Sequence, residues 1–111
     1  MATGTYKVPQ TQLLVDTITR EDVSIGTSGT AAYGNYTFDS SHGDITKSGY
    51  TPIAIVGYRI ATGTNSGTGA SFVMCYGAIL TSTTSASLYI RNTGSSTAKV
   101  NLSIDVLYRK D

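Results

Sequence analysis

The segment Lys99–Arg109 reads Lys-Val-Asn-Leu-Ser-Ile-Asp-Val-Leu-Tyr-Arg. Apolar residues at positions 100, 102, 104, 106 and 108 alternate with polar ones, and only Leu107 departs from the polar set. Successive side chains of a strand point to opposite faces, so this alternation predicts an antiparallel strand with one buried and one solvated face.

The other patterned segments are strand-like as well, because Thr, Val, Ile and Tyr dominate them and apolar residues seldom recur at helical spacing. The strands that we predict are Leu13–Arg20 with a continuation over Asp22–Ile25, Thr30–Asp39, Tyr50–Ala61, Ser71–Leu80, Ala86–Asn92 and the segment from Lys99. The last three follow one another at hairpin spacing and predict an antiparallel meander or one half of a sandwich. About seven or eight strands in a chain of this length indicate an all-β fold, an antiparallel two-layer β-sandwich that is jelly-roll-like.

Two of these strands carry an internal glycine. Gly34 interrupts its strand and predicts a bulge. Ile53–Val56 is a continuous apolar run, which is typical of a central strand with both faces covered. Gly57 follows that run, and its missing side chain would let a neighbouring backbone or a large ring, such as that of Tyr58 or Tyr76, pack closely.

Loops separate the strands. Ser40–Gly49 is polar, and Ile45 is expected to be its one inward anchor. Thr62–Ala70 carries several small turn formers and is predicted to be the longest flexible loop of the second half, where binding residues tend to collect. Residues 1–12 are interpreted as a lead-in or stalk connection, and residues 13–111 as the sandwich domain.

Composition restricts the classes of function. The 111 residues fit one domain, and charged residues are only 14% of the chain with a net charge of +1. The eight basic residues are scattered, which argues against nucleic acid as a partner. No apolar run approaches the ~20 residues of a membrane span, so membrane insertion is not expected. The single Cys75 lies among apolar residues and is predicted to be a buried free thiol.

Catalytic and metal chemistry find little support. Ser40–Asp44 holds serine, histidine and aspartate within five residues, yet loop neighbours seldom face one another in the geometry of a hydrolytic triad. One histidine and one cysteine cannot supply a zinc site, and Asp39 and Asp44 lack the spacing of a calcium loop. We therefore expect no enzyme activity, no metal and no cofactor.

Sugar binding is the ligand chemistry that the composition accommodates. Tyrosine faces stack on the apolar side of a sugar ring, while Asn, Thr and Arg side chains bond its hydroxyls. The candidate ligand-binding residues are Tyr33, Tyr36, Tyr50, Tyr58 and Asn65. For each tyrosine the alternative is packing in the core or at a subunit interface.

Three motifs carry a family resemblance. Lys47–Tyr58 reads Lys-Ser-Gly-Tyr-Thr-Pro-Ile-Ala-Ile-Val-Gly-Tyr, Leu88–Asn92 reads Leu-Tyr-Ile-Arg-Asn, and Val106–Lys110 reads Val-Leu-Tyr-Arg-Lys. Over about Thr17–Lys110 the chain resembles the C-terminal receptor-binding head domain of bacteriophage and prophage tail-fibre or tail-tip proteins. These motifs are mostly core hydrophobes and turns.

The resemblance implies a non-catalytic tail protein, generally a homotrimer, that recognises a host surface polysaccharide or another envelope receptor. Its place would be the virion tail, beside other tail subunits, after synthesis in the bacterial cytoplasm. The chain departs from that design because only residues 1–12 precede its first strand, whereas such heads follow a long shaft. Either the chain is an isolated head domain, or it is a small separate virion protein. The alternative function is therefore that of a structural virion protein, such as a capsid decoration, head-fibre or baseplate component. In either case we expect the outward Leu107 to pack against another subunit or an overlying loop.

Overall fold

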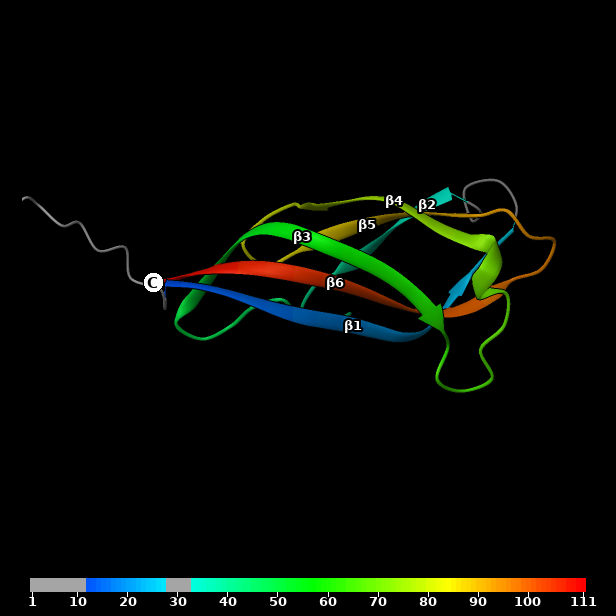
Figure 1. The fold of residues 1–111 in the computed structure, drawn as a ribbon, viewed down its shortest axis with the longest axis horizontal. Helices are drawn as coiled ribbons and strands as arrows, with labels where there is room; N and C mark the ends of the chain where they lie inside the picture. The colour runs from blue at the N-terminus through cyan, green and yellow to red at the C-terminus, as the bar shows by residue number, and fades with distance from the viewer. Residues whose placement is uncertain (1–11, 28–32) are drawn as a thin grey trace, which may run out of the picture.

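A computed structural model of the chain describes residues 12–27 and 33–111, with Tyr33 described by its backbone alone. The described part holds six strands and one short 3₁₀ helix: β1 (Leu13–Ile25), β2 (Tyr33–Phe38), β3 (Tyr50–Thr62), η3 (Ala70–Phe72), β4 (Val73–Leu80), β5 (Ala86–Asn92) and β6 (Ala98–Lys110). Two antiparallel sheets, ordered β1-β6-β3 and β2-β5-β4, pack together (Figure 1). The predicted all-β, two-layer sandwich is confirmed, and its jelly-roll character stays a prediction.

The strand β6 is the middle of its sheet and pairs with β1 on one side and β3 on the other. The inward-facing side chains of β6 are buried, each at most 1% exposed: Ala98, Val100, Leu102, Ile104, Val106 and Tyr108. The intervening residues from Lys99 to Leu107 are half-buried on the outer face. The predicted alternation of a buried and a wetter face is therefore confirmed.

The strand β3 differs from its prediction, because it is an edge strand with β6 as its only partner in the described sheet. Its apolar run is not covered on both faces: Ile53 is 42% exposed and Val56 is 55% exposed. The register shifts between Pro52 and Ala54 and again between Ile55 and Gly57, so two bulges interrupt the alternation of faces. An uninterrupted apolar run therefore does not identify a central strand here.

The two other predicted irregularities have opposite outcomes. β1 continues through a register shift between Arg20 and Val23, where Asp22 has a φ of 54°, and this confirms the expected bend. The bulge predicted at Gly34 is wrong, because β2 pairs with β5 in unbroken register. Gly34 instead leaves room for a ring on the same face, since a Cβ there would lie 3.1 Å from Cε2 of Tyr36.

The last three strands do not form one meander. β4 and β5 are an antiparallel hairpin, as predicted, but the chain then crosses to the other sheet to enter β6. The buried Asn92 fixes this crossing, because its Nδ2 donates to the carbonyl oxygens of Ile25 and Ser96, each at 3.1 Å. Its Oδ1 accepts a bond from the backbone N–H of Gly94 at 2.8 Å. Strand spacing along the sequence does not reveal that a buried side chain makes these three hydrogen bonds.

The loop between β2 and β3 is tied to the core by Ile45. Its side chain is fully buried, which confirms the predicted inward anchor. The hydroxyl of Tyr108 donates a buried 2.6 Å bond to the carbonyl oxygen of Ile45. The Tyr108 ring also meets the Tyr50 ring edge-on, with centroids 6.5 Å apart.

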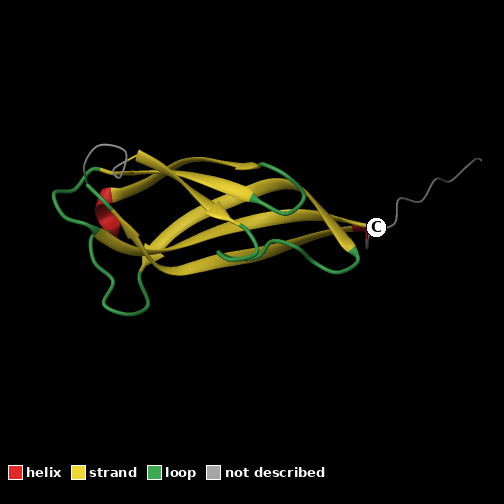
Figure 2. Cartoon of the chain, turned by 180° about the vertical axis from the view of Figure 1, so that it is seen from behind, coloured by secondary structure: helices red, strands yellow, loops and turns green. Residues whose placement is uncertain are grey.

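The strands run along one long axis, so the molecule has two distinct ends (Figure 2). Leu13 pairs with Arg109, and Tyr50 pairs with Lys110, so β1 and β3 begin where β6 ends. We call this the C-terminal end. The β3–β4 and β5–β6 connections lie at the opposite end, which we call the far end. In the described part, no helix is long and apolar enough to cross a membrane.

Candidate functional site

The predicted ligand residues are spread along the molecule. Tyr50 pairs with Lys110 at the C-terminal end, and Asn65 lies at the far end, where it binds Asp22 beside Asn101. The nine steps of β6 between Asn101 and Lys110 separate the two positions by roughly 30 Å at about 3.3 Å per strand residue. Tyr58 lies between them and is 42% exposed. The five residues therefore do not converge on one site.

Tyr36 is a packing residue by its surroundings. Its side chain is half-buried against the core, and burial raises the pKa of its hydroxyl, an effect that the nearby Arg20 partly opposes. The side chain of Tyr33 lies outside the described part of the chain. Leu107 is half-buried on the outer face, level with Val15 on β1 and Ala54 on β3, and its predicted subunit contact stays a prediction.

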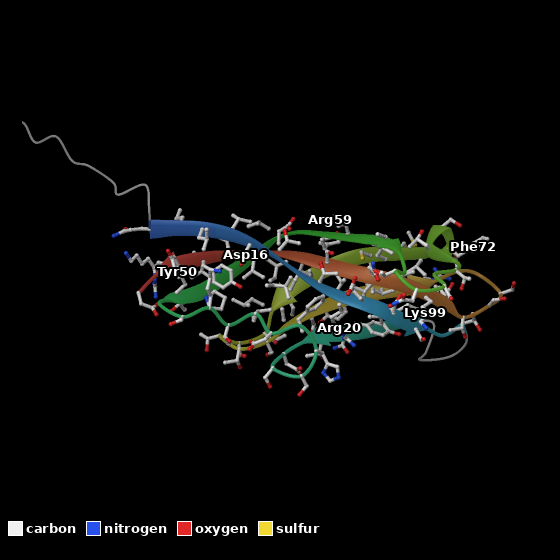
Figure 3. All side chains as sticks on the ribbon, turned by 90° about the horizontal axis from the view of Figure 1, so that it is seen from below. Asp16, Arg20, Tyr50, Arg59, Phe72 and Lys99 are labelled. Atoms are coloured by element: carbon white, nitrogen blue, oxygen red, sulfur yellow. The ribbon has the colours of Figure 1, made fainter. Side chains whose placement is uncertain are left out.

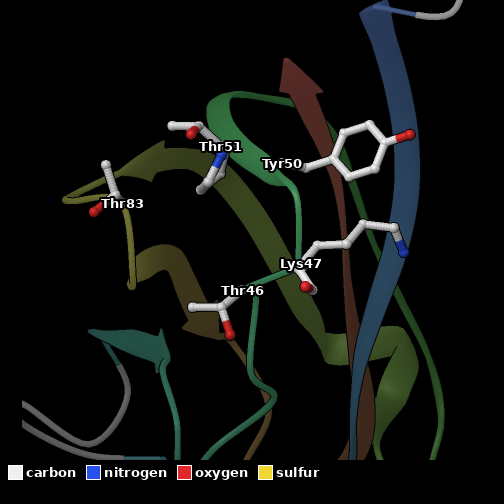
Figure 4. A pocket seen from close by; sticks show the side chains of 7 residues that line it. Thr46, Lys47, Tyr50, Thr51 and Thr83 are labelled. Atoms are coloured by element: carbon white, nitrogen blue, oxygen red, sulfur yellow. The ribbon is translucent and has the colours of Figure 1, made fainter. Parts of the chain in front are cut away.

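An open hollow of about 500 Å³ lies at the C-terminal end (Figure 4). Its lining comes from the β2–β3 loop, the start of β3 and the β4–β5 turn: Thr46, Lys47, Ser48, Tyr50, Thr51, Pro52 and Thr83. The side chains of Lys47 and Tyr50 point toward β1, whereas Thr51 and Thr83 lie on the side of the β4–β5 turn. The hollow is thus rich in hydroxyls, with its aromatic ring at one border.

Carboxylates hold three of the six polar side chains that line this hollow. Lys47 Nζ lies 3.0 Å from Asp16 Oδ2, and the hydroxyl of Thr51 donates to Asp111. Asp44 accepts bonds from the backbone N–H and the hydroxyl of Thr46, and these bonds hold the pKa of Asp44 below its usual value. The hydroxyls of Ser48, Tyr50 and Thr83 make no hydrogen bond within the described residues, so these three groups are the ones that could bond a polar neutral ligand.

The far end carries a second polar cluster, built on the bulge of β1. The carboxylate of Asp22 accepts bonds from the backbone N–H and from Nδ2 of Asn65, both at 3.0 Å, and these bonds lower the pKa of Asp22. Asn101 accepts from the backbone N–H of Asp22 at 2.9 Å and donates to the hydroxyl of Thr64, also at 2.9 Å. That hydroxyl donates to Glu21 at 2.7 Å. We call these five residues the anchor network.

The anchor network changes the interpretation of the Thr62–Ala70 loop. The backbone N–H groups of Gly63 and Thr68 both donate to the carbonyl oxygen of Lys99, and the N–H of Lys99 donates back to Thr68. The base of the loop is also closed, because a Cβ on Gly67 would lie 2.3 Å from the backbone nitrogen of Gly63. The loop predicted to be flexible is therefore fastened at both its base and its tip.

Phe72 is an exposed aromatic residue that the sequence reasoning missed. It ends η3 at the far end (Figure 3), and 55% of its surface is exposed. Its carbonyl oxygen accepts bonds from the N–H of Thr93 at 2.8 Å and from the Thr93 hydroxyl at 3.0 Å. A Cβ on Gly94 would lie 3.0 Å from Phe72 Cβ, so the turn packs against the base of the ring. The sequence does hold one signal for this residue, because Phe72 is an aromatic residue that comes just after the glycine-rich Thr62–Ala70 loop.

In the triad-like segment Ser40–Asp44, the side chains of His42 and Asp44 contact other residues rather than each other. Nδ1 of His42 lies 3.0 Å from Oδ1 of Asp39, which also accepts a bond from the backbone N–H of Ser41. Asp44 binds Thr46. Within the described residues, no three His, Cys, Asp or Glu side chains are grouped so that they could hold a metal ion.

Cys75 is half-buried rather than fully buried, and it is a free thiol. Burial raises its pKa to about 11. A thiol with so high a pKa is almost entirely protonated at neutral pH and is a poor nucleophile.

Comparisons of the chain with models of protein families, with curated proteins and with solved structures find no match.

Proposed function

We propose that this chain is a non-catalytic phage tail-fibre or tail-tip domain that recognises a host cell-surface glycan or another envelope receptor through its far end. The position of β1 supports this proposal. β1 begins at the C-terminal end, where Leu13 pairs with Arg109, so a segment that precedes β1 joins the domain at that end. The far end is then the part of the domain that points away from such a segment.

The observation that carries the proposal is the pairing at the far end of an exposed ring with a fastened polar loop. Phe72 offers an apolar face of the kind that stacks on a sugar ring. The side-chain amide oxygen of Asn65, which accepts no hydrogen bond within the described residues, remains for the sugar hydroxyls because only the amide nitrogen is bonded to Asp22. Because the anchor network already orders the loop, little conformational entropy is lost on binding. A shallow site of this kind gains useful avidity when several copies act together, as in a homotrimer on a virion tail.

Binding to a glycan array and to whole host cells tests this function, with Phe72→Ala as the decisive variant. We expect saturable binding by the unaltered chain and binding about tenfold weaker by the variant, the equivalent of roughly 1.4 kcal/mol of ring contact. Val15→Ala is the matched control, because Val15 is 53% exposed at the other end. Truncation of an exposed side chain changes stability little, so both variants remain folded.

The outcomes separate the candidate sites. Binding that Phe72→Ala leaves unchanged, and that Ser48→Trp abolishes by filling the hollow, would move the site to the C-terminal end. Absence of binding to any envelope fraction would contradict receptor recognition.

The alternative is a structural virion protein that acts through contacts with capsid, head-fibre or baseplate subunits. It is favoured by the number of exposed apolar side chains on β3 and β4. Sedimentation of the purified chain with virions or tail particles that lack it tests this alternative. Stoichiometric incorporation without any glycan binding would favour it.

A further inference from the structure

The β2-β5-β4 sheet has an outer face that is turned away from the core, and β5 is the middle strand of this sheet (Figure 1). Leu88 and Ile90 of β5 are fully buried, so the residues that alternate with them point outward. The outward residues of interest, with the partners that the register places beside them, are Tyr89 and Arg91 on β5, Asn35 on β2, and Met74 and Gly77 on β4. We call this surface the β5 face.

Two tyrosine rings meet at the middle of the β5 face. Tyr89 pairs with Gly77, and a Cβ on Gly77 would lie 3.9 Å from Cδ2 of Tyr89, so the ring of Tyr89 lies over the glycine. A register shift between Cys75 and Gly77 leaves Tyr76 without a partner on β5. The Tyr76 ring centroid is 6.1 Å from that of Tyr89, with the ring planes 37° apart, which places Tyr76 on the same face. Tyr76 is 56% exposed, so the pair presents aromatic surface to solvent.

Hydrogen-bonding groups lie beside the two rings and are not used by the protein. Asn35 pairs with Tyr89 from the other side of β5, and it is exposed. Within the described residues, neither the amide of Asn35 nor the hydroxyls of Tyr76 and Tyr89 make a hydrogen bond. A sugar presents both an apolar ring face and hydroxyls, so aromatic rings beside unengaged amide and hydroxyl groups suit a sugar.

The outer face of the β1-β6-β3 sheet is different, because its polar side chains bond one another. The hydroxyl of Thr17 donates to Asp105 at 2.6 Å, and Arg59 donates to the same carboxylate at 2.9 Å. The hydroxyls of Thr19 and Ser103 lie 2.8 Å apart. The polar groups of that face are satisfied within the chain, whereas those of the β5 face are left for a ligand.

Charge favours an anionic group in that ligand. Arg91 is exposed and is the one charged residue in β2, β4 and β5, which contain no Asp or Glu. It follows Tyr89 by two residues on β5, a distance of about 6.6 Å along the strand. The planar guanidinium matches a carboxylate in both shape and charge. The β5 face therefore complements a sugar that carries a carboxylate, which is a uronic acid.

The β5 face continues toward the far end. Phe72 directly precedes β4, and Met74, the next outward residue, pairs with Arg91. Phe72 and Tyr76 are four residues apart, which corresponds to about 13 Å at 3.3 Å per strand residue. A single sugar ring is too small to contact both, whereas a chain of several rings can follow β4 from Phe72 to the tyrosine pair.

We propose that the β5 face binds an acidic oligosaccharide, with sugar rings stacked on Tyr76 and Tyr89 and a uronic-acid carboxylate at Arg91. The inference rests on the proposed function, because it names the class of glycan and adds a second binding surface beside the far end. Separate variants of the two surfaces distinguish failure of the one from failure of the other.

An array of oligosaccharides in matched pairs, each uronic-acid member beside its neutral counterpart, tests the proposal with the full chain. We expect tighter binding to the uronic-acid member of a pair, and tighter binding to long members than to single sugars. Tyr76→Ala and Tyr89→Ala should each weaken binding by about tenfold, through loss of ring contact. Arg91→Gln should weaken binding to the acidic member by about fivefold, as expected of a solvent-screened charge contact, and leave the neutral member unchanged.

Matched controls come from the outer face of the other sheet. Val15→Ala truncates an exposed apolar side chain, and Arg109→Gln removes an exposed guanidinium. Neither should alter binding to any member of the array. Circular dichroism checks the fold of each variant. Tyr76→Ala carries the conclusion if Tyr89→Ala fails to fold, because the Tyr76 side chain stands at a bulge and is more than half exposed.

The outcomes separate the two surfaces. Glycan binding that Phe72→Ala weakens and that the three β5-face variants leave unchanged would overturn this inference and retain the proposed function. The reverse pattern would support the β5 face and remove the far-end site. Preference for the neutral members would overturn the inference, and so would equally tight binding to polyglutamate, which would indicate an acidic protein partner. Absence of binding to every glycan would contradict both proposals.

Discussion

Removal of the Tyr108 hydroxyl tests directly how the β2–β3 loop is held against the core. Tyr108→Phe removes one oxygen and keeps the ring, which is 1% exposed and packs edge-on against Tyr50. The loss leaves the carbonyl oxygen of Ile45 without the 2.6 Å bond that it accepts in a buried setting. An unsatisfied buried acceptor costs about 1–3 kcal/mol, so we expect the free energy of unfolding to fall by about 2 kcal/mol.

Urea unfolding followed by circular dichroism measures this change at one fixed protein concentration, because self-association would also shift the midpoint. The melting temperature should fall by about 8–12 °C for a domain of this size. Tyr50→Phe is the matched control: Tyr50 is half-buried, and its hydroxyl makes no hydrogen bond within the described residues. That variant should change the unfolding free energy by less than about 0.5 kcal/mol.

Equal losses in both variants would mean that the effect comes from generic removal of a tyrosine hydroxyl, and a loss below about 0.5 kcal/mol in Tyr108→Phe would refute the role of this bond. Proteolysis within Ser40–Gly49 gives an independent reading, because the loop should open more often once its carbonyl anchor is gone.

Two further predictions concern titratable groups. Hydrogen bonds from Thr17 and, to a lesser extent, Arg59 hold the pKa of Asp105 below its ordinary value of 3.8. The stability that these bonds contribute is complete above pH 3.8 and is lost as the pH falls through the lowered pKa. Asp105→Asn should therefore flatten the acid side of a plot of urea midpoint against pH. An unchanged acid limb in that variant would contradict this, whereas a residual limb is expected because the pKa values of Asp22, Asp39 and Asp44 are lowered as well. The pKa of Cys75 is raised from 9.0 to about 11, so its reaction with a thiol reagent at pH 8 should be roughly 100-fold slower in the native chain than in urea. Equal rates in the two conditions would show that the thiol is as accessible and as acidic as in the unfolded chain.

The fold was predictable where local pattern and burial agree. The alternation along Lys99–Tyr108 identifies β6 because every second residue meets the opposite sheet. Ile45 is recognisable as an anchor because it is the one large apolar residue of its loop. The bend after Arg20 follows from the break in apolar spacing.

The predictions failed where tertiary partners decide. Nothing in the run Ile53–Val56 tells whether its second face is covered by the same chain or by another, so an edge strand was taken for a central one. Gly57 is close to neither backbone nor ring: a Cβ there would lie 2.6 Å from Oδ2 of Asp105, a contact set by the register between β3 and β6. The crossing after β5 depends on the side chain of Asn92, which a count of turn residues does not reveal.

The candidate site was less predictable than the fold. Tyrosines were chosen for their chemistry, yet Tyr36 and Tyr50 pack against the core, and nothing in their spacing distinguishes that role from an exposed one. Asn65 was placed correctly in a loop, but its amide is used to hold Asp22. Phe72 was passed over because its neighbours in sequence are strand-like.

The central position of β6 has a consequence for synthesis on the ribosome. β1 and β3 pair with β6 and not with each other, so their sheet cannot form while β6 is still unmade. Until then both strands are unpaired, and the apolar residues of β3 are open to misassociation with neighbouring nascent chains. The β4–β5 hairpin needs only a short turn and can close first. A nascent chain of this protein is thus most vulnerable just before β6 emerges, when a chaperone that shields β3 would have its greatest effect.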